Sequence, residues 1–464
     1  MSTRIFIAAA LAALYLAAPA AATAAPPTPG QAEQLGRDAY RYGFPLLEIL
    51  RVRAEQTSVR CPDVFGDAPV NSFSHSGGFA RPKDRTVVAP NTDTLYSIAH
   101  LDLGRGPVVL RHPGMGRRYF VFELVDPYTN VIGYIGTRTT GSDAGRFAIS
   151  WNRRRAPKPR NVESVIHSQF RRVWIIGRTL TTDAADQRKA QKLMHRYRLY
   201  GPNGRPRAFS KSCRPGKPDK PRTPTHGPRF LRALARGMTE NPPPKRDRPL
   251  LRRLATVGIG PGRTPAEANL PADVVAAVHA GVAAEAAEMP GSIRTTVLQR
   301  SIAAGGWAVL PPAIGDYGTD YDLRAAVAVV GLGANTPAEA IYPTALTDSS
   351  GALLDGAAHD YRMVFPPGGE PPVRYFWSLT MYDLDGFLVK NPIRRYSLGP
   401  THPPLRRRAD GSIVIAIQQD RPAEKGVNWL PAPVASFRLN LRLFGPRKAA
   451  RTGTWKAPPV VPVG

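Results

Sequence analysis

The sequence predicts a multidomain α+β protein in which two β-rich units are separated by a helical middle region. Three observations carry this prediction. Short segments rich in Val, Ile, Phe and Tyr recur between residues 95 and 177, Ala-rich segments with helix-capping residues follow between 264 and 339, and strand patterns return from 361 to 444. A chain of 464 residues is long enough for two or three domains that each bury a core.

Residues 1–24 are predicted to be a secretory signal peptide. Arg4 precedes an apolar run that extends from Ile5 to about Ala18, and the small residues Ala22 and Ala24 form a cleavage signal. An uncleaved membrane anchor is the alternative, because the run is nearly long enough to span a bilayer. We therefore expect a soluble protein that is secreted or periplasmic after signal peptide cleavage.

The chain is strongly basic, with 63 Lys and Arg against 35 Asp and Glu and a formal net charge of +28 at pH 7. An exported protein meets little nucleic acid, so nucleic acid is not an expected partner. Anionic polymers of the cell envelope or lipid head groups are the expected counter-surface. The alternative is that the charge only solvates the surface. The oligomeric state is not indicated by the sequence.

Cys61 and Cys213 are the only cysteines, and both lie in loop sequence close to a proline. An even number of cysteines in an exported protein predicts a Cys61–Cys213 disulfide, with two free thiols as the alternative. A metal site built on cysteine is not supported.

Residues 31–200 are the predicted N-terminal β-rich domain. It begins with an amphipathic helix from Gln31 to about Val52, interrupted near Gly43 and Pro45. A polar helix is expected from Thr182 to His195. Between the two helices lie six short predicted strands that suit a β-sandwich or barrel: Leu95–His100, Val108–His112, Arg118–Val125, Val131–Ile135, Arg146–Ser150 and Arg172–Gly177.

Residues 201–250 are predicted to be a basic connector, because the stretch is rich in proline and buries too little apolar surface to fold alone. One helix, Phe230–Met238, is expected within it. A binding role for this basic arm is an open alternative to a simple linker.

Residues 251–345 are the predicted helical middle. Thr264 and Thr336 each begin a Thr-Pro-Ala-Glu pattern, which is typical of a capped helix start. A helix that begins at Pro271 is expected to stop at Pro290.

Residues 346–450 are the predicted C-terminal β-rich domain. The expected strands are Tyr361–Phe365, Arg374–Tyr382, Phe387–Val389, Ile393–Tyr396, Ser412–Gln418 and Phe437–Phe444. In the last of these, apolar residues alternate with Arg438, Asn440 and Arg442, which predicts a strand with one buried and one solvated face.

Long ordered motifs in the chain resemble a known bacterial family. VAPNTDTLYSIAHLDLGRGPVVLRHPGMGRRYFVFELVDPYTNVIGYIGTRTTG is similar to domain of unknown function 1254, and GMTENPPP with GIGPG is similar to the helical region after it. YRMVFPPGGEPPVRYFWSLTMYDLDGFLVKNPIRRYSLG, DGSIVIAIQ and NWLPAPVASFRLNLRLFGP resemble its usual partner, domain of unknown function 1214. The resemblance implies two jelly-roll-like β units with a helical part between them, and it implies no established activity. The chain departs from the family pattern at Ser150–Arg155 and in the longer basic arm after Tyr200.

Asn91, Thr92, Asp93 and Tyr96 form the leading candidate site. Asp93 is a candidate catalytic base, with Asn91 and Tyr96 as hydrogen-bonding partners. The structural alternative is that Asn91 and Asp93 cap a turn after Pro90 through the backbone.

Asp126 and Arg138 are candidate ligand-binding residues, and a buried ion pair between two strands is the favoured alternative. Trp377, Tyr382 and Trp429 could offer an aromatic platform for a sugar, although aromatic residues in β units more often belong to the core. His75 is a lone candidate and is more often structural. No metal-binding or nucleotide-binding motif occurs, so neither metal nor cofactor is expected.

The sequence therefore predicts an exported binding or accessory protein for a small polar, anionic or carbohydrate ligand. An enzyme of the hydrolase or lyase type, with Asp93 as base, is the alternative. The ligand is expected between the two β-rich units, where the Asn91–Tyr96 loop and the Trp377–Arg395 segment would face one pocket. Arg138 and Arg395 would face the anion, since a guanidinium donates two parallel hydrogen bonds to a carboxylate or phosphate.

Overall fold

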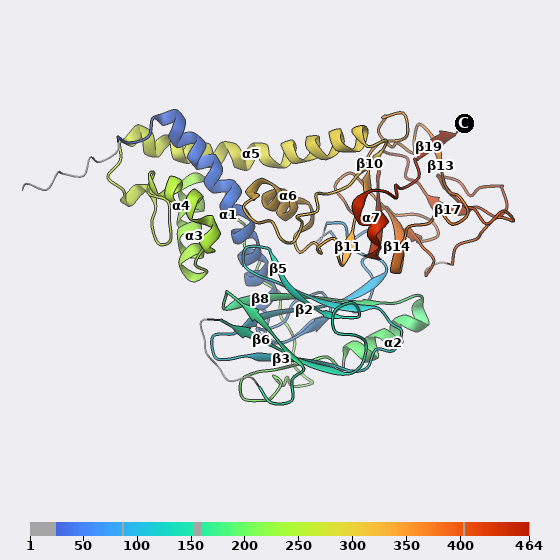
Figure 1. The fold of residues 1–464 in the computed structure, drawn as a ribbon, viewed down its shortest axis with the longest axis horizontal. Helices are drawn as coiled ribbons and strands as arrows, with labels where there is room; N and C mark the ends of the chain where they lie inside the picture. The colour runs from blue at the N-terminus through green and yellow to red at the C-terminus, as the bar shows by residue number, and fades with distance from the viewer. Residues whose placement is uncertain (1–24, 86–87, 153–158, 402–403, 464) are drawn as a thin grey trace, which may run out of the picture.

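The computed structural model describes residues 25–463 except 86–87, 153–158 and 402–403. The predicted signal peptide, residues 1–24, lies outside the described residues. Within the described ranges the chain is a multidomain mixture of helices and sheets, as predicted. In Figure 1 the N-terminal sheets lie below, a group of helices lies at the upper left and the C-terminal sheets lie at the upper right. None of the helices in these ranges meets the length and hydropathy that a membrane span requires.

The N-terminal β unit contains two sheets that share one apolar core. The first sheet has the order β1-β2-β8-β4-β5, and the second has the order β7-β6-β3-β9. The six predicted strands all appear, within a few residues of their expected ends. The bounds are β1 Ser74–His75, β2 Thr94–Asp102, β3 Val108–His112, β4 Phe120–Val125, β5 Val131–Gly136, β6 Gly145–Trp151, β7 Ser164–Ser168, β8 Arg172–Leu180 and β9 Arg198–Tyr200. Helix α2, Ala184–Met194, is capped by the Asp183 carboxylate and packs against this unit.

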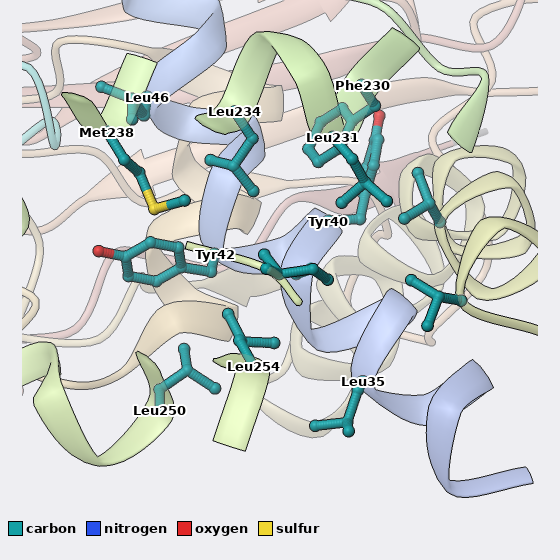
Figure 2. Packing of buried hydrophobic residues seen from close by; sticks show 14 of the residues in the cluster. Leu35, Tyr40, Tyr42, Leu46, Phe230, Leu231, Leu234, Met238, Leu250 and Leu254 are labelled. Atoms are coloured by element: carbon teal, nitrogen blue, oxygen red, sulfur yellow. The ribbon is translucent and has the colours of Figure 1, made fainter. Parts of the chain in front are cut away.

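The helices pack into a separate core, part of which is drawn in Figure 2. Helix α1 comes from the start of the predicted N-terminal domain and α3 comes from the predicted connector, yet both join this core through residues such as Tyr42 and Phe230. The bounds are α1 Pro29–Thr57, α3 Gly227–Glu240, α4 Arg248–Ala255, α5 Ala272–Ala303 and α6 Tyr321–Gly331, with 3₁₀ turns η1 Lys245–Asp247 and η2 Pro265–Glu267.

Two predicted helix interruptions are wrong. Helix α1 runs unbroken through Gly43 and Pro45, and the missing side chain at Gly43 gives room to Leu234 of α3. Helix α5 continues past Pro290 because Met289 and Ile293, on either side of it, both contact the helical core. A proline inside a helix removes one backbone donor, and its ring crowds the carbonyl four residues earlier. Tertiary packing outweighs this cost at Pro45 and Pro290.

The two capping-box patterns also differ from the prediction. Thr264 forms a capping box, but it begins only the short turn η2. No helix follows Thr336, because Glu339 turns into the interface between the β units.

The C-terminal β unit also contains two sheets around one core. One sheet has the order β10-β12-β18-β14-β15 with β11 on β18, and the other has the order β17-β16-β13-β19. The bounds are β10 Trp307–Ala308, β11 Ala340–Ile341, β12 Thr344–Ala345, β13 Asp360–Phe365, β14 Val373–Tyr382, β15 Ser397–Leu398, β16 Ile413–Gln418, β17 Asn428–Pro431, β18 Arg438–Pro446 and β19 Val461–Val463, with helix α7 Lys448–Thr452.

Three expectations for the C-terminal unit are corrected. Phe387–Val389 contributes one isolated bridge, Tyr382 to Leu388, and the strand predicted at Ile393–Tyr396 is replaced by β15 immediately after it. The polar face of β18 is buried rather than solvated, since Arg442 is 4% and Asn440 is 9% exposed. The N-terminal unit covers that face.

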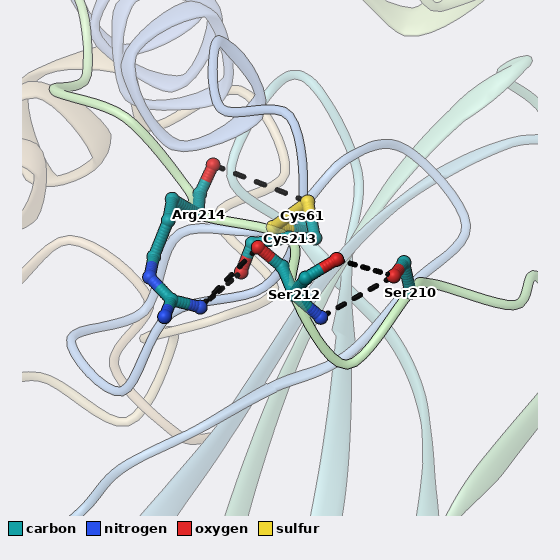
Figure 3. The surroundings of a disulfide bond; sticks show 5 residues. All are labelled: Cys61, Ser210, Ser212, Cys213 and Arg214. Atoms are coloured by element: carbon teal, nitrogen blue, oxygen red, sulfur yellow. Dashed lines mark hydrogen bonds between the residues drawn. A yellow bond between two sulfur atoms is a disulfide. The ribbon is translucent and has the colours of Figure 1, made fainter.

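Cys61 and Cys213 form a disulfide, as the cysteine count predicts. Figure 3 shows the bridge beside Ser210, Ser212 and Arg214, where it joins the loop after α1 to the basic arm that precedes α3. The backbone N–H of Arg60 donates to the Pro215 carbonyl at 3.0 Å, so the arm is also hydrogen-bonded at this point.

Helices α1 and α5 cross at two glycines, and this close approach gives a testable prediction. A Cβ at Gly281 would overlap the Glu33 carbonyl, and one at Gly36 would overlap the Val278 carbonyl. We expect Gly281→Ala to lower the free energy of unfolding by about 1–3 kcal/mol, because overpacking forces the helices apart. Gly291→Ala is the matched control in α5, where a Cβ meets nothing within 4 Å and should be neutral or stabilising. Equal effects in urea unfolding would contradict this account.

Candidate functional site

The Asn91–Tyr96 loop ends in a buried contact with the C-terminal unit. The Asn91 side-chain oxygen accepts the backbone N–H of Asp93 at 2.6 Å, so the expected turn is present. The Asp93 carboxylate, 1% exposed, accepts the Ser378 hydroxyl at 2.6 Å. The Thr92 hydroxyl donates to that of Ser397 at 2.8 Å. Asp93 therefore joins the two β units.

Arg442 and Tyr382 extend this contact from the other side. The Arg442 guanidinium donates to the Thr380 hydroxyl at 2.8 Å and to the Ala89 carbonyl at 2.7 Å. The Tyr382 hydroxyl donates to the Pro90 carbonyl at 2.6 Å. Burial lowers the pKa of Arg442, but the neighbouring Tyr382 and Asp93 raise it by more, so Arg442 stays charged.

The two segments predicted to share a pocket thus touch each other directly. Ser378 faces the N-terminal unit, while Trp377, its neighbour on β14, points to the opposite face of the strand. Trp377 is 2% exposed and packs against Phe365 with ring centroids 5.1 Å apart, so it is a core residue. No platform for a sugar forms at this position.

The expected Asp126–Arg138 pair does not form. Asp126 accepts the backbone N–H groups of Tyr128 and Asn130 at 2.8 and 3.0 Å, which fixes a turn. Burial raises its pKa to about 6 against those hydrogen bonds. Arg138 instead donates to the buried Glu339 at 2.6 Å. Sequence patterns did not indicate this partner, because Glu339 lies 201 residues further along the chain.

The remaining predicted residues are also bound within the protein. Arg395 donates to the Trp429 carbonyl at 2.9 Å, and the Trp429 indole donates to the Gln418 carbonyl at 2.9 Å. The Tyr96 ring lies 5.7 Å from the Arg178 guanidinium, which pairs with the buried Glu123 at 2.7 Å. Arg138 and Arg395 do not face a common anion site.

A pocket of about 470 Å³ lies elsewhere between the two β units. Its walls are the loop before β2, the turn after β14 and the segment before β18, and its lining residues are Pro82, Lys83, Arg85, Asp383, Leu388, Val389, Lys390, Pro433, Ala435 and Ser436. Four of them belong to the predicted Trp377–Arg395 segment. The loop residues Pro82, Lys83 and Arg85 were not predicted as a site, and the only sequence signal for them is that Arg81–Arg85 is a basic, turn-forming stretch.

The charged groups of this pocket are mostly basic. Arg85 pairs with Asp383 at 3.1 Å, and its guanidinium lies 4.2 Å from the centre of the Phe387 ring. Within the described ranges, Lys83 and Lys390 form no ion pair, and both are exposed. Three cations therefore surround one carboxylate, beside an apolar wall that includes Leu388 and Val389.

Two family models match the chain, one in each β unit. Family models match residues 70–201, described as protein of unknown function (DUF1254), and residues 339–448, described as protein of unknown function (DUF1214). The chain belongs to the proteins that carry the first domain ahead of the second, as its motifs predicted.

A solved structure shares this fold. The VPA0106 protein of Vibrio parahaemolyticus is 22% identical with a TM-score of 0.67, over 93% of this chain and 100% of that one. A putative uncharacterized protein from Burkholderia cenocepacia matches at 13% identity and a TM-score of 0.43, over 93% of each chain. No curated protein matches the sequence.

The buried Asp93–Ser378 contact predicts a specific loss of stability. Ser378→Ala removes a donor to a buried carboxylate and should lower the free energy of unfolding by about 1–3 kcal/mol. Ser212→Ala is the control, because its exposed hydroxyl lies 2.8 Å from the exposed Ser210 hydroxyl and contacts no buried carboxylate of the described residues, so stability should change by less than about 0.5 kcal/mol. Chemical denaturation measures both, and a neutral Ser378→Ala would argue against the buried contact.

His75 predicts a loss of stability in acid. Its Nδ1 lies 2.9 Å from the Ser97 hydroxyl, and burial, with help from nearby His195 and Arg198, lowers the pKa of His75 to about 3. Unfolded histidine has a pKa of about 6.5, so the stability contributed by neutral His75 is complete above that pH and declines between pH 6.5 and 3. At pH 5 the loss should reach up to about 2 kcal/mol. His75→Gln should flatten this slope in denaturation series at pH 7 and pH 5, and an unchanged slope would contradict the assignment.

Proposed function

We propose that the protein is an exported, soluble binding or accessory protein of the cell envelope. Its ligand is a small anion with an apolar face, such as a sugar acid, held in the 470 Å³ pocket between the β units. The observation that carries the proposal is the charge of this pocket, where Lys83, Arg85 and Lys390 outnumber the single carboxylate of Asp383. The volume lies in the range of pockets for small molecules.

The arrangement of the side chains suits an amphipathic anion. Arg85 contacts the Asp383 carboxylate and the Phe387 ring, and these two contacts favour one direction of its guanidinium at the pocket. The two lysines provide flexible charges that can close on a carboxylate. The apolar wall suits the carbon face of a sugar ring. The hydroxyl groups of the sugar would then face the polar residues at the edge of the pocket.

Binding is better supported than catalysis. A hydrolase or lyase with Asp93 as base requires the carboxylate to reach a substrate. Asp93 is 1% exposed and accepts the Ser378 hydroxyl within the contact between the units.

Two finer features complete the proposal. The first feature is a jelly-roll-like fold for each β unit. It is supported by the two sheets that surround one core in each unit. Export is supported by the Cys61–Cys213 disulfide, since disulfides persist in oxidising compartments.

Titration with glucuronate tests the proposed pocket. Lys83→Ala with Lys390→Ala should weaken glucuronate binding at least about tenfold in calorimetry, because two charge-assisted contacts are lost. Glucose, which lacks the carboxylate, should bind more weakly than glucuronate to the unmodified protein. Lys189→Ala with Lys192→Ala on α2 removes the same charge from an exposed site and should leave affinity within about twofold.

Two results would contradict the proposed pocket. If glucuronate binds the pocket variant and the unmodified protein equally, the ligand site lies elsewhere. If the α2 control loses as much affinity as the pocket variant, the attraction is only the general field of a basic protein.

A further inference from the structure

A row of arginines crosses the second sheet of the N-terminal unit. Arg111 on β3 is paired in register with Arg146 on β6 and with Arg198 on β9. Residues paired directly across strands project from the same face of a sheet. Arg111 and Arg198 are exposed, so the row lies on the outer face of this sheet.

The charges of this row are not balanced by carboxylates. Within the described ranges, Arg111, Arg146, Arg196 and Arg198 form no ion pair. The Glu163 carboxylate accepts the backbone N–H of Arg146 at 3.2 Å, and no ion pair between Glu163 and the Arg146 guanidinium forms within the described residues. Like charges opposite each other destabilise a sheet. The row therefore lowers the free energy of unfolding, a cost that solvent-facing strands do not otherwise require.

Two of these arginines, Arg146 and Arg198, are held in place by contacts within the unit. The Arg198 guanidinium donates to the Tyr197 carbonyl at 2.8 Å and also to the His195 carbonyl. The Arg146 guanidinium lies 5.1 Å from the centre of the Tyr200 ring on β9. Because β3 lies between β6 and β9, the Arg146 side chain must extend across β3 to reach that ring. Its Nε is buried and without a hydrogen-bond partner.

These side chains border a small hollow. It has a volume of about 150 Å³ and is lined by Arg111, Pro113, Arg196, Arg198 and Tyr200. Three of its five lining residues are therefore arginines, and none is acidic. The volume suits one small group rather than a whole sugar or peptide.

We propose that this arginine row is a binding site for a phosphate group, carried by a free phosphate compound or by a lipid head group. Guanidinium groups donate pairs of parallel hydrogen bonds to phosphate oxygens, and Arg198 is already oriented by backbone carbonyls that carry no net charge. A bound phosphate would offset the repulsion between Arg111 and its two neighbours. The site is on the outer face of the N-terminal unit and shares no residue with the pocket between the units.

Calorimetry and vesicle sedimentation on the full mature chain test the site and distinguish the two phosphate sources. The soluble probes are inorganic phosphate and glycerol 3-phosphate, and the vesicles are phosphatidylglycerol in phosphatidylcholine against phosphatidylcholine alone. Arg111→Ala and Arg198→Ala should each weaken binding about tenfold or more, since each removes charge-assisted hydrogen bonds. Arg105→Ala is the control, because it removes the same charge from an exposed turn of the same unit and should change affinity by less than about twofold.

Arg111→Glu separates loss of the site from loss of the fold. The carboxylate would lie opposite Arg146 and Arg198, so repulsion becomes attraction. At low salt the melting temperature should rise by about a few degrees while phosphate binding is lost.

The outcomes divide cleanly. Loss in the row variants with soluble probes assigns a free phosphate compound, and loss only with phosphatidylglycerol vesicles assigns a head group. The proposal is overturned if neither probe binds, if the row variants bind as the unmodified protein does, or if Arg105→Ala weakens binding equally. A lower melting temperature for Arg111→Glu would contradict the proposed repulsion between Arg111 and its neighbours Arg146 and Arg198.

Discussion

The structure depends on satisfying polar groups that are buried between its two β units. Four polar groups of the N-terminal unit are buried at this contact: the Thr92 and Asp93 side chains and the Ala89 and Pro90 carbonyls. Their hydrogen-bond partners in the C-terminal unit are Ser378, Ser397, Arg442 and Tyr382. A buried polar group without a partner costs about 1–3 kcal/mol, so a small rotation of one unit against the other would be penalised at several points. This constraint fixes the loop before β2 against the C-terminal unit. The pocket between the units exists because that loop is held there.

Buried arginines play the same part elsewhere in the molecule. Arg324 of α6 is fully buried among the rings of Tyr42, Tyr128 and Tyr321, at 4.9–5.5 Å from their centres, and donates to the Tyr42 carbonyl. Tyr42 belongs to α1, while Tyr128 lies in a turn of the N-terminal unit. Glu339 similarly receives Tyr119 and Arg138 from that unit. Apart from Tyr321, which lies on α6 itself, these partners come from elements far apart in sequence. The helices and both β units are therefore held as neighbours by specific pairs as well as by apolar packing.

The two basic regions arise in different ways. The pocket between the units is assembled from three separate loops, and its shape therefore depends on how the units are docked. The arginine row is set by strand register within a single sheet, which places Arg146, Arg111 and Arg198 side by side whatever the C-terminal unit does. A ligand at the pocket would report on the contact between units, whereas one at the row would not. Together they locate part of the net charge of +28 in defined places.

Local patterns in the sequence determined most of the elements, because strand alternation, helical spacing and paired cysteines act over short range or through simple chemistry. They predicted β3 with its observed ends, the disulfide and the two-domain family. The tertiary structure alone decided which faces are buried and which polar groups meet. The sequence pattern predicts that Arg442 is a solvent-facing residue of an alternating strand and that Asp93 is a base or a turn cap. In the structure each residue is buried by the opposite β unit. Pairings such as Arg138 with Glu339 span about two hundred residues and are set by domain docking, which leaves no periodic trace in the chain.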